Sequence, residues 1–446
     1  MLQLTLVILF SIFGVCTGIA TGLLPGLHVN NVALILSSLS GSIVAIFDFL
    51  FEFGISKEFI LVLICVFIIS CSIAHTFLDC IPATFLGAPD PDTALSVLPA
   101  HSLLLEGKGY EAVALSAMGS YGAILFCFLL LFPIRFIIGA PLFFYDTMQE
   151  IMLFVLIAIS ILMIATEKGR IEPFKIKGAL PSIFGMLFAL FVFILSGIFG
   201  LLILDMSVDS PIGLSSPVLF PALAGLFGTP TLLTSLMTKP TIPKQIIENP
   251  VLDRKAKKSS ILSVTTGSFG GILVSIIPGI TSATGTIIAM NARGESDKKQ
   301  TIITLSAVNT ACAFFVVVVM FIILKSRSGA ALAVMDLISV SEWTDILMPT
   351  NLAYLLIAIL LGGTLSYFLT LKMGKVFAKH FANVPYVLIV KLTIALIIIL
   401  VFLFTGLLGL LILFIATFIG LLPVEWGVRR SHCMGVLLIP IILYFL

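Results

Sequence analysis

Long apolar runs separated by short polar breaks follow one another along nearly the whole chain of 446 residues. Many of these runs approach the roughly 20 residues that a helix needs to cross the hydrocarbon core of a bilayer. Within that core, only helices and closed barrels satisfy every backbone N–H and C=O group. We therefore expect an all-α, polytopic protein of the cell membrane, embedded in the lipid bilayer, with about 10 to 12 transmembrane helices.

The composition excludes several other classes of protein. Hydrophobic residues make up 60% of the sequence and charged residues 10%, whereas about a quarter of a typical soluble domain is charged. The formal net charge of +2 offers no polybasic surface, so we expect no nucleic-acid partner. The seven cysteines include no C-x-x-C pair and lie within or beside apolar runs. We expect them to pack, and we expect no metal site and no cofactor.

The basic residues indicate the topology. Most of them fall into five short stretches, at residues 168–177, 239–258, 293–299, 372–379 and 429–430. The positive-inside rule places all five stretches in the cytoplasm. The connection at residues 205–211 carries only acidic charge, as expected for an external turn.

Three segments contain Pro and Gly where a continuous helix would be expected. Residues 260–290 are too long for one untilted span and too short for two, yet both ends adjoin basic stretches, which predicts a re-entrant hairpin. Residues 80–100 and 24–31 are interrupted in the same way, because Pro breaks the helical hydrogen-bond ladder. The predicted tips are Pro25 and Gly26, Gly87 and Pro89, and Pro278 and Gly279.

The interrupted segments recur along the chain. Pro89, Gly107 and Ser116 each have a counterpart 187 to 190 residues later, namely Pro278, Gly294 and Ser306. This spacing predicts a duplication, with a first repeat at residues 1–175, a second at 176–430 and a C-terminal half-span at 431–446. Repeats with paired interrupted helices are typical of secondary transporters. By analogy we favour repeats of inverted orientation, and the local charges leave a parallel arrangement open.

Neutral polar residues cluster at the breaks. They are His28, Asn30 and Asn31 after the first break, Thr281, Ser282 and Thr284 after the last, and Asn309 within the following span. Exposed N–H groups at a helix start, together with hydroxyl and amide donors, would suit a carboxylate substrate. The alternatives are an interfacial turn capped by Asn, hydroxyls bonded to their own helix, and a helix–helix hydrogen bond from Asn309.

Two groups of ionisable residues lie in apolar surroundings. Asp90 and Asp92, with Thr93, could bind a coupling Na⁺ or proton, or cap the next helix. His75 and Asp79 are spaced i, i+4 and could form a metal half-site or a proton relay. With no third ligand nearby in the sequence, a structural pair at a helix end is the preferred interpretation.

Four segments together resemble a known family. They are residues 18–27 (GIATGLLPGL), residues 87–95 with GAPD followed by TAL, residues 277–280 (IPGI) and residues 427–435 (GVRRSHCMG). The pattern is similar to the large membrane subunit of tripartite tricarboxylate transporters, in particular to its divergent archaeal-type branch. Departures from the usual motifs occur at Asp90-Pro91-Asp92 and at residues 306–310.

The resemblance implies a duplicated permease of about ten to twelve helices that moves small organic anions, such as di- or tricarboxylates, with an ion gradient. It also implies a small membrane subunit and an extracytoplasmic binding protein as partners, and the sequence is compatible with a homo-oligomer. We predict a secondary active transporter that works by alternating access, not an enzyme. Two alternatives stay open: an intramembrane enzyme that uses His75, Asp79, Asp90 and Asp92, and a lipid-carrier flippase with a lateral groove.

Overall fold

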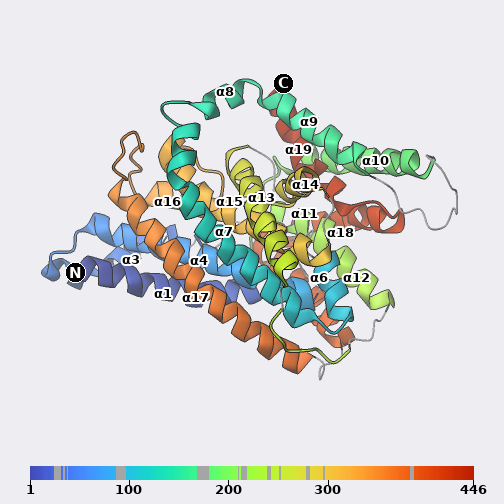
Figure 1. Cartoon of the computed structure of the whole chain (residues 1–446), viewed down its shortest axis with the longest axis horizontal. Coiled ribbons are helices and arrows are strands. Elements are labelled where there is room, and N and C mark those ends of the chain that lie inside the picture. The colour runs from blue at the N-terminus through green and yellow to red at the C-terminus, as the bar shows by residue number, and fades with distance from the viewer. Residues whose placement is uncertain are drawn as a thin grey trace.

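The computed structural model is mainly helical and contains no strand in the part that it describes, which comprises residues 1–24, 32–33, 36–37, 39–86, 97–167, 180–208, 210–211, 218–238, 243–250, 253–277, 282–294, 297–381 and 386–446. Figure 1 shows the arrangement of the helices. In chain order they are α1 (Leu2–Leu23), α3 (Ser40–Ile46), η1 (Asp48–Phe53), α4 (Lys57–Leu78), α5 (Cys80–Phe85), α6 (Val97–Leu105), α7 (Gly109–Ile138), α8 (Phe144–Glu150), α9 (Met152–Ala165), α10 (Leu180–Ile203), α11 (Leu219–Leu223), the π-helix η4 (Ala224–Gly228), α12 (Thr229–Thr238), α13 (Arg254–Ile276), α14 (Ser282–Arg293), α15 (Lys298–Ile323), α16 (Gly329–Leu337), α17 (Thr350–Phe381), α18 (Tyr386–Glu425), η5 (Arg430–Met434) and α19 (Gly435–Tyr444).

The prediction of an all-α, polytopic membrane protein is confirmed. Among the described residues, eight helices are long and apolar enough to cross a membrane, or up to nine when the bent pair α8 and α9 counts as one span. The expected ten to twelve spans are therefore not all present as separate long helices. The difference arises in three regions.

Two predicted spans are broken in the structure, and two others are joined. Residues 31–50 form an apolar run that we expect to span the membrane, but the longest helix described there is the seven-residue α3, which is followed by the start of η1. The predicted span 214–236 becomes α11, η4 and α12, where Gly225, Gly228 and Pro230 interrupt a regular helix. The apolar runs 384–403 and 407–422, which we expect to form the last two spans, meet within α18 at Gly406, whose φ of 62° bends the chain between them.

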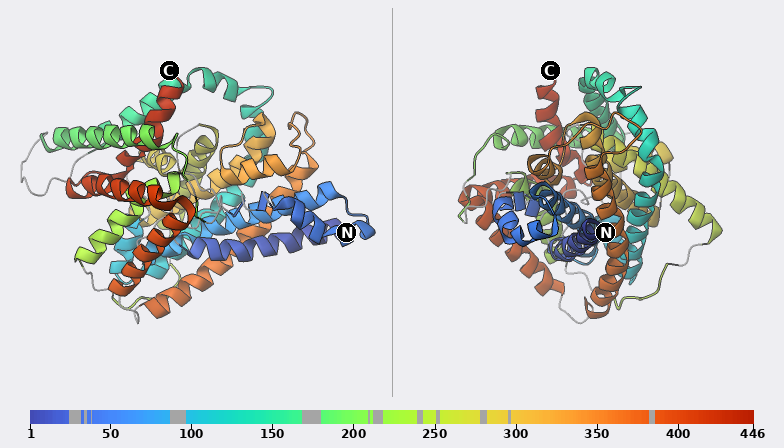
Figure 2. Two further views of the ribbon diagram at one scale, coloured as in Figure 1. Left: turned by 180° about the vertical axis from the view of Figure 1, so that it is seen from behind. Right: turned by 90° about the vertical axis from the view of Figure 1, so that its left-hand side faces the viewer.

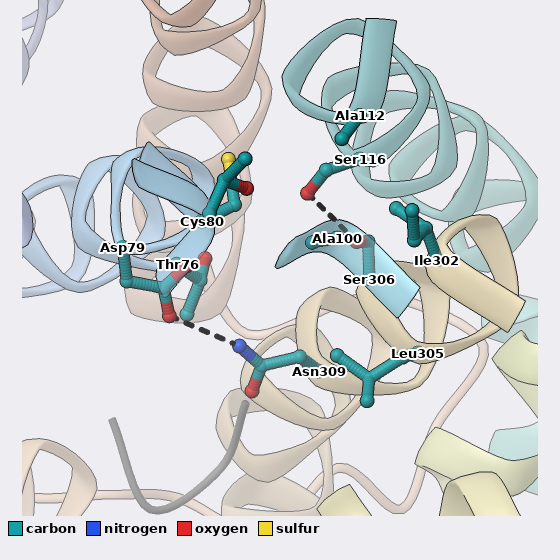
Figure 3. A pocket seen from close by; sticks show the side chains of 11 residues that line it. Thr76, Asp79, Cys80, Ala100, Ala112, Ser116, Ile302, Leu305, Ser306 and Asn309 are labelled. Carbon is teal, nitrogen blue, oxygen red and sulfur yellow. Dashed lines mark hydrogen bonds between the residues drawn. The ribbon is translucent and has the colours of Figure 1, made fainter. Parts of the chain in front are cut away.

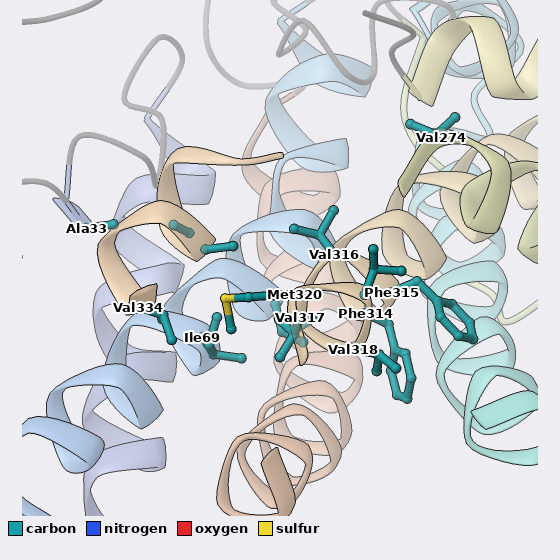
Figure 4. Close-up of a cluster of buried hydrophobic side chains, with 14 of the residues drawn as sticks. Ala33, Ile69, Val274, Phe314, Phe315, Val316, Val317, Val318, Met320 and Val334 are labelled. Atoms are coloured by element: carbon teal, nitrogen blue, oxygen red, sulfur yellow. The ribbon is translucent and has the colours of Figure 1, made fainter. Parts of the chain in front are cut away.

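Helix α15 is the centre of the bundle. It is buried over most of its length, as expected for a helix surrounded by other helices, and its side chains from Phe314 to Met320 contact residues of its neighbours (Figure 4). The neighbours include α4, α7 and α13. The polar residues of α15 are therefore held at fixed positions by packing.

Glycines allow the closest helix–helix contacts. A Cβ atom on Gly14 would lie 2.4 Å from the carbonyl oxygen of Phe67, and one on Gly18 would lie 2.5 Å from Cβ of Ala74. These contacts bring α1 against α4. Gly267 and Gly271 bring α13 against α15 in the same way. Small residues at such spacing let helix backbones approach closely in a membrane.

Helices α7 and α15 lie side by side and run in the same direction. Glu111 near the start of α7 pairs with Lys299 at the start of α15, and the Phe128 and Phe314 rings meet farther along at 5.0 Å between centroids. The offset of the predicted repeat makes these two helices counterparts. In inverted repeats, counterpart helices cross the membrane in opposite directions. Because α7 and α15 run in the same direction, this pair does not meet the expectation of inverted repeats.

Helices α13 and α14 form an antiparallel hairpin. Arg293 at the end of α14 donates hydrogen bonds to Ser259 and Ser263 in the first turns of α13. Farther up, Gly270 and Gly285 lie against each other. With 12 residues, α14 is about 18 Å long and too short to cross a bilayer.

The earlier interruption begins later than the sequence suggested. Residues Lys57–Phe85 form one apolar helical stretch of 29 residues, so helix extends past residue 80 to Phe85. Pro82 lies in the first turn of α5, where its missing N–H is tolerated. Helix α1 ends at Leu23, and Leu24 is extended.

Candidate functional site

A small buried cavity lies where α4, α5, α6, α7 and α15 meet (Figure 3). It has about 10 Å³ for the centre of a water-sized molecule, which is room for about one water. Six of the eleven residues that line the cavity carry a hydroxyl, carboxyl or amide group. Its walls are formed by Thr76, Asp79, Cys80, Thr84, Ala100, Ala112, Ser116, Ile302, Leu305, Ser306 and Asn309.

Asn309 connects three helices at one end of the cavity. Its amide Nδ2 donates to Oδ2 of Asp79 on α4 at 3.5 Å, and its Oδ1 accepts from the hydroxyl of Ser282 on α14 at 3.2 Å. Asn309 and Asp79 are only 5% and 4% exposed. A buried carboxyl group is costly unless it is hydrogen-bonded, so this junction is a specific feature of the bundle.

Two serines form the opposite side of the cavity. The hydroxyls of Ser116 on α7 and Ser306 on α15 are 2.8 Å apart, and either can donate. Figure 3 shows this pair and the Asp79–Asn309 pair on two sides of the same space. The side chains that surround the cavity thus come from both predicted repeats.

His75 lies one turn before Asp79 but has a different partner. Its Nδ1 is 3.1 Å from the hydroxyl of Thr21 on α1, which is buried. His75 therefore connects α4 to α1, while Asp79 connects α4 to α15. Among the described residues, no group of three or more His, Cys, Asp or Glu side chains could hold a metal ion.

Only some of the residues singled out in the sequence are described in the structure. Ser282 and Asn309 are hydrogen-bonded to each other. Thr284 lies in α14, and its side chain is outside the described part. The remaining predicted site residues also lie outside the described residues: Pro25, Gly26, His28, Asn30, Asn31, Gly87, Pro89, Asp90, Asp92, Thr93, Pro278, Gly279 and Thr281.

Sequence reasoning missed the hydroxyls of Thr76, Ser116 and Ser306. A single Ser or Thr in an apolar helix gives no indication of the direction in which it points, because its hydroxyl can bond to its own helix. One signal did exist: Ser116 and Ser306 are counterparts in the predicted repeat, 190 residues apart.

The cavity can hold one small species that is coordinated or hydrogen-bonded by oxygen atoms. A carboxylate, an amide oxygen and several hydroxyls are the ligands that hard cations prefer. A water molecule would find the same partners. A di- or tricarboxylate does not fit into a space of this size, so binding such an anion here would require the helices to separate.

A bundle of membrane-spanning helices around a buried polar cavity is characteristic of membrane transport proteins. The model of the tripartite tricarboxylate transporter TctA family matches residues 8–435, and the chain belongs to this family. Uncharacterized protein MJ1079 of Methanocaldococcus jannaschii is 30% identical over 444 residues, which cover 98% of this chain and 99% of that protein. No solved structure matches the chain.

Family membership establishes the general class of the protein. The chain is an integral membrane component of a transport system and is not an enzyme. Proteins of this family work in tripartite systems with a second membrane subunit and a binding protein. The intramembrane enzyme that the sequence left open is therefore excluded.

Proposed function

We propose that the chain is the permease of a secondary transport system for small organic anions, in particular di- or tricarboxylates, driven by Na⁺ or H⁺ through alternating access. The observation that carries this proposal is the junction at Asn309, which contacts Ser282 on one side and Asp79 on the other. Family membership supports the transported class of molecule.

The chemistry of the junction suggests separate roles for its residues. Asp79 would repel a carboxylate at close range and attract a cation, so we assign it to the coupling ion. Ser282 and Asn309 are neutral donors and suit the anion. Since Asn309 touches both neighbours, the loss or gain of a cation at Asp79 would change the orientation of the amide that meets the substrate.

The other predicted site residues remain part of the proposal. His28, Asn30, Asn31, Thr281 and Thr284 are proposed substrate contacts. Asp90, Asp92 and Thr93 are proposed as further contacts of the coupling ion. A partner membrane subunit and a binding protein would deliver the anion from outside the cell. The flippase alternative would require a groove open to the lipid in place of the enclosed cavity.

The size of the cavity fits a closed state of such a transporter. Its 10 Å³ admits a water molecule or a bare cation, and an organic anion would enter only after α4–α6 and α15 separate. A ligand that binds the separated arrangement more tightly would shift the population toward it.

Uptake into proteoliposomes tests the proposal. The chain and its partner subunits are reconstituted, a Na⁺ or H⁺ gradient is imposed, and accumulation of labelled di- and tricarboxylates is measured. We expect gradient-dependent uptake that falls at least about five-fold with Asn309→Ala, because loss of one buried amide contact costs about 1–3 kcal/mol. Asn351→Ala at the start of α17 is the matched control and should retain uptake. No uptake of any carboxylate under either gradient would overturn the proposal.

A further inference from the structure

Helix α13 begins with an unusual concentration of positive charge. Arg254, Lys255, Lys257 and Lys258 all lie exposed in its first turns, and no acidic residue is present in the first turn. The N-terminal end of a helix carries a partial positive charge from the aligned peptide dipoles, so cations are unfavourable there. Only the capping carboxylate of Asp253, which accepts from the N–H of Ala256 at 2.6 Å, opposes this charge.

Lysines also occur at the start of α15, but there acidic side chains pair with them. Lys298 pairs with Glu106 at 3.0 Å, and Lys299 pairs with Glu111. The hydrogen bond and charge of Lys298 lower the pKa of Glu106 below its ordinary value. The four cations of α13 form no ion pair with any residue in the described part of the chain. These four exposed charges are therefore open to an anion from outside the chain.

A shallow groove lies along α13, from these cations to the apolar residues of the next turn. Its lining passes from the ammonium groups of Lys255 and Lys258, past the hydroxyl of Ser259, to the apolar side chains of Ile261 and Leu262, with Thr265 beyond them. Ile261 is 65% exposed and Leu262 48%. In the right-hand view of Figure 2 the start of α13 stands out at the edge of the molecule.

We propose that this groove binds an anionic phospholipid, with the phosphate between Lys255 and Lys258 and an acyl chain along Ile261 and Leu262. The order of cation, hydroxyl and hydrocarbon along the groove matches the order of groups in such a lipid. The basic stretch lies on the cytoplasmic side by the positive-inside rule, where clusters of Lys and Arg beside a span attract anionic headgroups.

The bound lipid would steady the base of the α13–α14 hairpin. Arg293 of α14 donates to Ser259, which also lines the groove, and to Ser263, and the lipid would neutralise the lysines beside this contact. The inference concerns lipid binding alone, so it stands or falls independently of the transported substrate.

Lipid binding to the full-length, delipidated protein in detergent tests the inference. Phosphatidylglycerol, phosphatidylcholine and inorganic phosphate are titrated separately, and the binding constant and the midpoint of thermal unfolding are measured. We expect phosphatidylglycerol to bind and to raise the midpoint. Lys255→Gln and Lys258→Gln should each weaken this binding about five-fold, which corresponds to about 1 kcal/mol per lysine near an anionic headgroup.

Lys257→Gln is the matched control, because it removes the same charge from the same turn but from a residue that does not line the groove. Without lipid, a variant that combines Lys255→Gln and Lys258→Gln should be as stable as the wild type or more stable, since it carries less positive charge at the N-terminal end of the helix. A general folding defect would instead lower the lipid-free midpoint. Equal stabilisation by phosphatidylcholine, equal weakening by Lys257→Gln, or tight binding of phosphate alone would each overturn the inference.

Discussion

Arg135 shows how a charge is accommodated inside this bundle. Its side chain, only 3% exposed, donates to the carbonyl oxygens of Trp343 at 3.1 Å and Ala140 at 2.7 Å, and also to that of Thr344. The guanidinium lies 4.9 Å from the centre of the Phe136 ring. A guanidinium has five donors in a fixed plane, so one side chain satisfies carbonyls from two separate loops beyond the helix ends.

We therefore expect Arg135→Leu to destabilise the protein by about 2–4 kcal/mol, because it leaves buried carbonyl groups without donors. Arg135→Lys should recover part of this loss, since an ammonium group can reach fewer of the carbonyls. The midpoint of thermal unfolding in detergent measures both effects, with the exposed Lys379→Leu as control. A normal midpoint for Arg135→Leu would show that the loops hold their positions without the guanidinium.

Individual site residues could be predicted from the sequence where their side chains are unusual in a membrane-spanning helix. Asn309 and Ser282 stood out because amides and clustered hydroxyls are rare in apolar helices, and the structure describes both at the cavity junction or beside it. Thr76 and Ser306 did not stand out. Their role depends on the rotation of each helix about its axis, which is set by packing contacts between segments far apart in the chain.

At the level of elements, helix α1 depends on close contact with α4. Substituting Gly18 with Leu would place side-chain atoms where Cβ alone is already 2.5 Å from Ala74. We expect this substitution to separate the two helices and to break the contact between Thr21 and His75, at a cost of several kcal/mol. Gly41→Ala is the control, since nothing lies within 4 Å of a Cβ atom there.

The midpoint of thermal unfolding in detergent measures this effect. The rates at which Cys16 and Cys71 react with a thiol reagent show where α1 and α4 separate. We expect buried Cys71 to become reactive in Gly18→Leu and to stay protected in Gly41→Ala. Protection of Cys71 in both variants, with unchanged midpoints, would show that α1 tolerates a wider separation.

Element boundaries were predictable where composition alone decides them. Apolar runs located most of the spans, and the break between the last two falls at Gly406 as the sequence indicated. Prolines were less informative. Pro82 lies in the first turn of α5, and helix continues past it to Phe85, whereas the glycines around residue 225 coincide with a π-helix. A proline breaks a helix only where an N–H is needed, and that depends on its position within the turn.

For the whole molecule, the direction of α7 relative to α15 was the feature that the sequence could not decide. A helix has the same periodicity whichever way it runs, and the few charges around residue 108 did not fix its side of the membrane. The pairings of Glu111 with Lys299 and of Ser116 with Ser306 fix the direction. Helices α7 and α15 therefore begin at the same end of the bundle.

The Ser116–Ser306 contact joins the two predicted repeats, so a covalent bond at this point would prevent them from separating. Replacing both serines with Cys places two thiols where hydroxyls now lie 2.8 Å apart, close enough for a disulfide. Cys80 lines the same cavity and is replaced by Ala in the background. If transport requires the helices to separate there, oxidation should abolish uptake into proteoliposomes and dithiothreitol should restore it.

The matched control places a cysteine pair at Thr229 and Thr417, whose hydroxyls are 2.6 Å apart within the second predicted repeat. Oxidation of this pair should leave uptake intact, because α12 and α18 would move together. Undiminished uptake by the oxidised Ser116–Ser306 variant would mean that the two helices stay in contact throughout the cycle. The substrate would then have to cross by another route, and the motion would lie elsewhere in the bundle.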